Sequence, residues 1–284
     1  MSGADISPHF GPSTLRVGSA WAAAESAFEA GDLATARDHA ASIAAQSTGR
    51  GLERRFGRAH HLLARVAEAG GDTAGAERSF RTALSAFTLL EDEHTVAHVL
   101  SELASLRLRT GDFGGATEYA RQALGRAPGD VRSLTVLGYA QWLGGSPADG
   151  ESSFEHALRA SRNAVPALAG RGQIRADLGE YQAALTDLDR ALALGVSSQD
   201  EPDVRSARAL ALAALGRAAE ADAEMARALS PDPARPRTRL RRALIHTLSG
   251  QAEQASHDLE EILTIDPAPI EATTARRLLA RLRR

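Results

Sequence analysis

The sequence of 284 residues contains no cysteine, no lysine and few aromatic residues. Without cysteine the chain forms no disulfide, and it has no thiolate to serve as a nucleophile or a metal ligand. All 33 residues of the Lys and Arg group are arginine. This bias is typical of a GC-rich bacterial genome, although the planar guanidinium also suits carboxylates and phosphates. Aromatic residues make up only 4% of the chain, so packing must rely on Ala, Leu and Val in close helix contact.

Long apolar runs and targeting signals are missing as well. No stretch approaches the roughly 18 uninterrupted apolar residues of a membrane helix. Residues 1–17 lack the charged and apolar order of a signal peptide. We therefore expect a cytoplasmic protein with no membrane partner.

Motifs for catalysis and cofactor binding do not occur. The chain has no phosphate-binding loop, dinucleotide fingerprint or nucleophile elbow. His94 and His98 lie four residues apart, with Glu91 and Glu102 on the same helical stripe, but this spacing is common by chance. We expect a non-catalytic chain with no cofactor and no metal site.

Glycine recurs along the chain in one local setting. The positions are Gly31, Gly71, Gly111, Gly145, Gly179, Gly216 and Gly250, which by subtraction lie 40, 40, 34, 34, 37 and 34 residues apart. Seven residues before each glycine stands a small residue: Ala24, Ala64, Ala104, Gly138, Gly172, Ala209 and Ala243. Five residues after each stands another: Ala36, Ala76, Ala116, Gly150, Ala184, Ala221 and Ala255. Such a fixed pattern indicates a helical repeat protein.

Each repeat has the pattern of two helices separated by a turn. In residues 131–160, apolar residues recur at helical spacing on both sides of Gly145. The glycine supplies a left-handed backbone conformation at the end of the first helix. Asp32, Asp72, Asp112 or Ser146 directly follows the glycine and can cap the second helix.

These residues resemble the tetratricopeptide repeat, a family with a period of 34 residues. The resemblance rests on Leu134, Leu137, Gly138, Gly150, Phe154 and Ala157 in one unit, on Leu103, Ala104, Ala116, Ala123 and Pro128 in another, and on Gly172, Tyr181, Ala184 and Ala191 in a third. It implies an all-α fold, a right-handed α-α superhelix (a solenoid) of about seven helix-turn-helix repeats. We expect a flexible leader over residues 1–15, the solenoid over residues 16–269 and a capping helix over residues 270–284.

Two features depart from the family pattern. The first two intervals are six residues too long, which predicts extended helices or loops near residues 49–58 and 89–94. Arg205, Arg208, Arg239 and Arg242 occupy places where the family usually has apolar residues. The last units should therefore either pack less tightly or pair these arginines with acids.

In the family, the first helix of each repeat lines a concave groove that binds partner peptides. Carried over by position, this resemblance gives eight candidate partner-binding residues: Trp21, Phe28, His61, Arg65, Arg109, Tyr139, Trp142 and Gln173. The same face would also display Asp177, Ser206, Leu210, Leu240 and Leu244. We expect Tyr139 and Trp142 to act as apolar anchors and Arg65 and Arg109 as charged selectors. Alternatively, Trp142 fills space between neighbouring first helices or packs against a terminal extension.

Charge is unevenly distributed along the chain. Residues 235–284 contain 10 arginines and 6 acidic residues, and the rest of the chain is net negative. The arginines could bind nucleic-acid phosphates, or they could form the solvated face of an end cap. No aromatic residue stands among them, which favours the cap.

The sequence thus predicts a protein–protein interaction module, an adaptor, chaperone-like protein or assembly factor, that binds a peptide or helix in the groove. Two alternatives remain. One is a structural scaffold that self-associates into a homo-oligomer, and the other is a regulatory subunit that contacts nucleic acid through its arginine-rich end.

Overall fold

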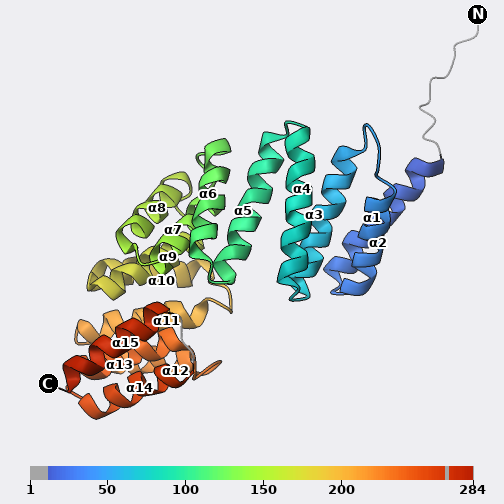
Figure 1. Ribbon diagram of the computed structural model, residues 1–284. Coiled ribbons are helices and arrows are strands. Elements are labelled where there is room, and N and C mark those ends of the chain that lie inside the picture. The colour runs from blue at the N-terminus through green and yellow to red at the C-terminus, as the bar shows by residue number, and fades with distance from the viewer. Residues whose placement is uncertain (1–11, 266–268, 284) are drawn as a thin grey trace, which may run out of the picture. The chain divides into compact units, whose positions relative to one another are not determined.

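A computed structural model describes residues 12–265 and 269–283 of the chain, and these residues form fifteen helices and no strand (Figure 1). The helices are α1 (Pro12–Glu29), α2 (Leu33–Ala45), α3 (Glu53–Ala69), α4 (Thr73–Leu89), α5 (Glu93–Arg109), α6 (Phe113–Arg126), α7 (Val131–Leu143), α8 (Pro147–Ala160), α9 (Val165–Leu178), α10 (Tyr181–Leu194), α11 (Glu201–Ala214), α12 (Ala218–Leu229), α13 (Pro236–Leu248), α14 (Ala252–Thr264) and α15 (Pro269–Leu282). The predicted all-α repeat fold is confirmed, while the number of repeats stays a prediction.

The seven recurring glycines all lie in the turns between an odd-numbered helix and the next even-numbered one. Each has a positive φ, from 72° at Gly250 to 97° at Gly145. Asp32 and Asp72 cap α2 and α4 by accepting a hydrogen bond from a main-chain N–H three residues later, as predicted. The prediction for Ser146 is wrong, because its hydroxyl makes no cap bond. Pro147, whose φ is preset for a helix, starts α8 instead.

The small residues allow the two helices of a repeat to approach closely. All fourteen positions are buried. At Gly138, an added Cβ would lie only 2.7 Å from the ring of Phe154. At Gly150, an added Cβ would lie 2.8 Å from the carbonyl oxygen of Gly138. Helices that approach this closely need no large side chains between them, which fits the low aromatic content.

The extra residues in the two 40-residue intervals between turn glycines lie in longer helices and in one longer loop. Helices α3, α4 and α5 each have 17 residues, and residues 46–52 form a long connection between α2 and α3. Between α4 and α5, Glu91 takes a positive φ of 53° and Asp92 caps α5 by accepting a hydrogen bond from the N–H of Thr95. Both predicted insertions are therefore confirmed.

The chain divides into two compact units. The first unit contains the described residues up to Thr110 together with Gly125–Ala127, and the second contains Gly111–Leu124 and the described residues from Pro128 onward. The core of the first unit includes Ile43, Leu62 and Val66.

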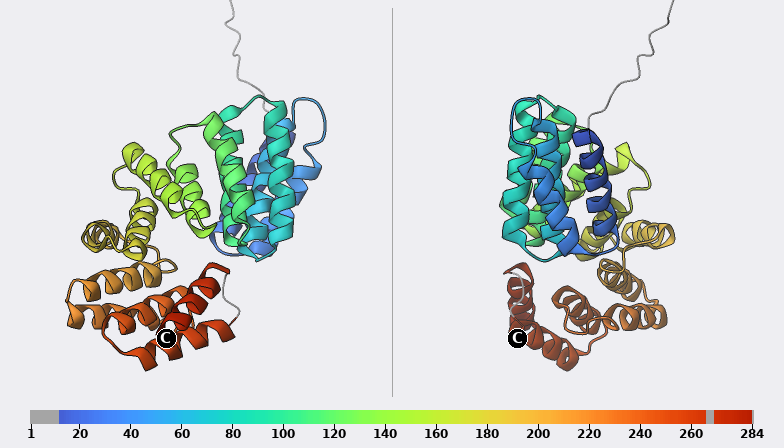
Figure 2. Two further views of the ribbon diagram at one scale, coloured as in Figure 1. Left: turned by 60° about the vertical axis from the view of Figure 1, so that its left-hand side comes forward. Right: turned by 90° about the vertical axis from the view of Figure 1, so that its right-hand side faces the viewer.

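In the second unit, the main core spans several repeats and includes Phe154, Leu168, Leu188 and Leu212. Consecutive first helices α7, α9, α11 and α13 lie side by side there. Helix α15 contacts both α13 and α14 (Figure 2), as a following first helix would.

The first and last helices can be compared with the expected leader and capping helix. Helix α1 begins at Pro12, so residues 12–15 are helical rather than part of a flexible leader. Residues 1–11, the rest of that expected leader, lie outside the described residues. Helix α15 occupies the range expected for the capping helix, with Ala275 and Leu279 buried against Leu259 and Ile262. Within residues 12–265 and 269–283, no helix combines the length and the apolar character that crossing a membrane requires.

Candidate partner-binding site

A buried arginine joins three first helices of the second unit. Arg241 of α13 is only 1% exposed, and its Nε and Nη2 donate to the two carboxylate oxygens of Asp177 on α9, at 3.0 and 3.1 Å. Its Nη1 donates to the carbonyl oxygen of Asp203 at 2.7 Å, to Ser206 Oγ at 3.1 Å and to Gln173 Oε1 at 3.3 Å. Gln173, one of the eight candidates, is thus 3% exposed and occupied by this network.

The predicted anchors Tyr139 and Trp142 serve the interior of the same unit. Trp142 is 5% exposed, and the guanidinium carbon of Arg237 lies 4.6 Å from the centroid of its ring. The Tyr139 hydroxyl donates to the carbonyl oxygen of Pro166 at 3.0 Å, and its ring meets Phe154 edge to face. Trp142 is therefore packed between helices, as the alternative interpretation states, and its role as an anchor stays a prediction.

In the first unit, the candidate aromatic residues lie beneath arginines. Arg58 lies 4.4 Å from the Trp21 ring centroid, and Arg65 lies 4.7 Å from that of Phe28. The indole Nε1–H of Trp21 also donates to Glu25 Oε1 at 2.7 Å.

The other two candidates of the first unit pair with acids. Arg109 forms an ion pair with Glu68. His61 Nε2 lies 2.5 Å from Glu102 Oε2 of α5. The proposed selectors Arg65 and Arg109 thus already contact their own chain, and the binding roles of the eight candidates stay predictions.

A pocket opens on the first helices of the second unit. It has a volume of ≈ 350 Å³ and is lined by Ala176, Asp177, Tyr181, Leu210, Leu244, Thr247, Leu248, Leu278, Arg281 and Leu282. Three of these, Asp177, Leu210 and Leu244, belong to the face predicted from the repeat register. Helix α15 contributes Leu278, Arg281 and Leu282 to the lining, which the position of residues within a repeat does not predict. The selection of eight missed the leucines, although Leu210 and Leu244 stand six residues before their turn glycines, as Tyr139 and Gln173 do.

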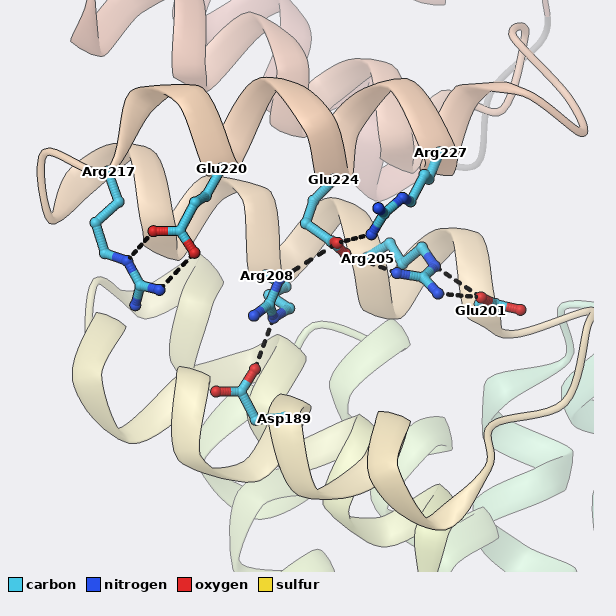
Figure 3. A network of polar contacts seen from close by, with 8 residues as sticks. All are labelled: Asp189, Glu201, Arg205, Arg208, Arg217, Glu220, Glu224 and Arg227. Carbon is cyan, nitrogen blue, oxygen red and sulfur yellow. Dashed lines mark hydrogen bonds and ion pairs between the residues drawn. The ribbon is translucent and has the colours of Figure 1, made fainter.

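The arginines at usually apolar positions pair with acids, so the second of the two predicted outcomes is confirmed. Arg205 and Arg208 both reach the buried Glu224, at 2.9 and 3.3 Å (Figure 3). Arg242 binds both oxygens of Asp258, which is 2% exposed. Arg239 pairs with Glu261.

The five arginines between residues 235 and 242 also form ion pairs within the chain. Arg235 pairs with Asp203 at 3.2 Å and Arg237 with Glu271 at 2.7 Å. With Arg239, Arg241 and Arg242 bound as described, all five arginines of this group contact acids of their own chain. Each of these guanidinium groups already has a carboxylate partner, while the choice between an end cap and a nucleic-acid surface stays a prediction.

Comparison with known proteins connects these features to a family. The sequence profile of the tetratricopeptide repeat matches residues 101–165 and 169–236. Protein FlbA of Caulobacter vibrioides is 31% identical over 59% of this chain and 33% of that protein, so the match spans about a third of that relative. A bacterial origin, expected from the composition, agrees with this relative.

Two solved structures resemble the chain in fold. A tetratricopeptide repeat protein from Parabacteroides merdae has a TM-score of 0.63 at 16% identity, covering 94% of this chain and 99% of that one. Pseudomonas aeruginosa pilF has a TM-score of 0.60 at 16% identity, covering 76% and 92%. At such identities the likeness shows the fold alone. The repeat profile indicates a protein-interaction module and no catalytic family. With its turn glycines, buried small positions and paired helices, the chain is a tetratricopeptide repeat protein whose residues 101–165 and 169–236 match the family profile.

Proposed function

We propose that this chain is a non-catalytic adaptor or assembly factor that binds a peptide or helix of a partner protein on the first helices of its second unit. The observation that carries the proposal is the pocket between α9, α11, α13 and α15. Three of its lining residues, Asp177, Leu210 and Leu244, belong to the face predicted to bind partners, and five of its ten lining residues are leucine.

The lining of the pocket suggests what the partner presents. Leu244, Leu248 and Leu278 are partly or largely exposed and offer an apolar surface for an aliphatic or aromatic side chain. Burying one such side chain contributes about 1.5–3 kcal/mol. Arg281 is exposed at the same pocket, so an acidic residue beside the apolar one would find a cation there.

The buried network of Arg241 supports this face from within. It fixes α9, α11 and α13 relative to one another, so the pocket is formed before a partner arrives. A preformed site loses less conformational entropy on binding than a mobile one. In this proposal Gln173 holds the face in place rather than touching the partner.

The experiment is a pull-down from extract of the native cell with the whole chain, Leu248→Glu and Leu194→Glu. Leu248 lines the pocket and is 53% exposed, while Leu194 lies at the end of α10 and is 44% exposed. Both substitutions place a charge at an exposed leucine, so neither should prevent folding. A protein lost with Leu248→Glu and kept with Leu194→Glu supports the proposal.

The same experiment addresses the alternatives. Recovery of the chain itself, unaffected by Leu248→Glu, would favour a self-associating scaffold. Binding that depends on Arg276 and Arg277 and falls steeply with salt would favour nucleic acid. The cytoplasmic location is part of the proposal and is tested by fractionating cells and probing each fraction for the chain.

A further inference from the structure

Three potential metal ligands from different repeats meet in the first unit. His61 lies on α3, and His98 and Glu102 lie one turn apart on α5. One donor atom from each of the three side chains lies within 4.8 Å of the other two. His98 Nε2 is 3.7 Å from Glu102 Oε1, and His61 Nε2 is 2.5 Å from Glu102 Oε2.

We propose that His61, His98 and Glu102 bind one divalent transition-metal ion, with Zn²⁺ as the best match. Two imidazoles and one carboxylate form a known three-ligand zinc set with a fourth position for water. Zinc bonds of 2.0–2.2 Å place tetrahedral ligands roughly 3.4 Å apart. The spacing of His98 and Glu102 is already close to this value. The contact between His61 Nε2 and Glu102 Oε2 would have to open by about 1 Å for both atoms to bind one ion. Mg²⁺ and Ca²⁺ prefer sites built from oxygen alone.

The surroundings suit an ion at this point. Glu102 is 9% exposed, and a buried carboxylate is costly unless a cation or hydrogen-bond donors compensate its charge. The ring of His61 is positioned by an edge contact with Phe80, at 5.8 Å between centroids. The side chain of His98 is 49% exposed, so an ion can enter from that side and keep a water ligand there.

In the sequence, the spacing singles out a different pair, His94 and His98, and the prediction from the sequence is that the chain has no metal site. His94 and His98 stand on the same helix, but His94 is exposed and is not one of the three grouped ligands. The additional histidine comes from α3, in the preceding repeat, and register alone does not reveal that contact. The ion would therefore link two successive first helices and stabilise the first unit.

The test uses the full chain without a polyhistidine tag, treated with chelator and then dialysed. We expect calorimetric titration with ZnCl₂ to give one ion per chain and a rise in Tm, and MgCl₂ to give neither. His98→Ala and Glu102→Gln should each weaken Zn²⁺ binding tenfold or more, since even loss of a residue that only orients a ligand costs roughly 10–100-fold.

His94→Ala is the matched control, because it removes an exposed histidine from the same helix without touching the group. It should bind Zn²⁺ as the unchanged chain does. Unfolding curves in EDTA establish that each variant is folded before titration. Absence of one-to-one binding, or equal affinities for His98→Ala and His94→Ala, would overturn the proposal.

Discussion

Arg171 and Asp187 form two parallel hydrogen bonds, from Nε to Oδ2 and from Nη2 to Oδ1, both 2.8 Å long. The two residues stand eight positions before and eight after the turn glycine Gly179. Arg208 with Glu224 and Arg242 with Asp258 repeat this relationship around the next two turn glycines. Three earlier repeats have Leu63, Leu103 and Leu137 at the arginine position. The last three repeats therefore replace an apolar contact between their helices with an ion pair.

Asp187→Ala should lower the free energy of unfolding by about 2–3 kcal/mol, because a hydrogen bond to a charged group is worth about 1.5–3 kcal/mol. The loss of several bonds is offset in part because the side chains of Arg171 and Arg175 are 20% and 17% exposed and can bind water instead. Asp187 is 4% exposed and also accepts a bond from Arg175, so its loss leaves two guanidinium groups without this partner. Asp189 lies on the same helix, pairs with Arg208 and is 52% exposed at its side chain. Asp189→Ala should cost at most about 1 kcal/mol. Urea unfolding measures both; equal costs would contradict this account.

Gly138→Ala should destabilise the chain by roughly 1–3 kcal/mol, as overpacking of a tight interface does. The new methyl group would press on the rigid Phe154 ring at 2.7 Å. Gly125 in α6 has no atom within 4 Å of an added Cβ. There the same change should stabilise by about 0.5–1 kcal/mol through helix propensity. Thermal unfolding of the two variants should thus give shifts of opposite sign, and shifts of the same sign would exclude the close-packing explanation.

Tyr139→Phe should change how stability depends on alkaline pH. Burial raises the pKa of the Tyr139 phenol, and the carboxylates of Asp200 and Asp203 add to the effect. An unfolded tyrosine loses its proton near a pH of about 10. The folded chain then binds more protons than the unfolded chain, so the free energy of unfolding falls as pH rises above that value. The chain has no lysine to titrate in the same range.

At neutral pH the variant should be less stable by about 1 kcal/mol, because the hydrogen bond to Pro166 is lost. The difference in free energy of unfolding between the two proteins should narrow as pH passes about 10. Only the unchanged chain loses stability there, because its folded state keeps the phenol protonated while its unfolded state does not. Denaturant unfolding at pH 7, 9 and 11 provides the comparison. Parallel loss of stability in both proteins would show that Tyr139 keeps an ordinary pKa.

Arg241→Met should lower the free energy of unfolding by about 3–5 kcal/mol, the usual cost of removing one partner from a buried ionic network. The substitution leaves the carbonyl oxygen of Asp203 and the side chains of Ser206 and Gln173 without their donor. Arg276→Met, at an exposed position of α15, serves as the control and should change stability little. A mild effect of Arg241→Met would mean that water replaces the guanidinium easily.

The fold was predictable because its signals are local. A turn glycine such as Gly145 and a small residue such as Gly138 act within one repeat, so their spacing can be read along the chain. The fate of Trp142 was not predictable, because its cover, Arg237, comes from a helix three repeats further on. The contact of His61 with Glu102 and the contribution of α15 to the pocket were not predictable for the same reason, because each joins residues of different repeats. Repeat register gives the face on which a residue lies, and contacts between repeats decide whether that face is open.

The most direct test of the central claim is the affinity of the captured partner segment for the unchanged chain, Leu248→Glu and Leu194→Glu, measured by calorimetry with proteins of equal Tm. The proposal predicts that Leu248→Glu weakens binding at least tenfold, about 1.4 kcal/mol or more, and that Leu194→Glu binds as the unchanged chain does. Equal affinities for all three proteins would show that the pocket between α9, α11, α13 and α15 does not receive the partner.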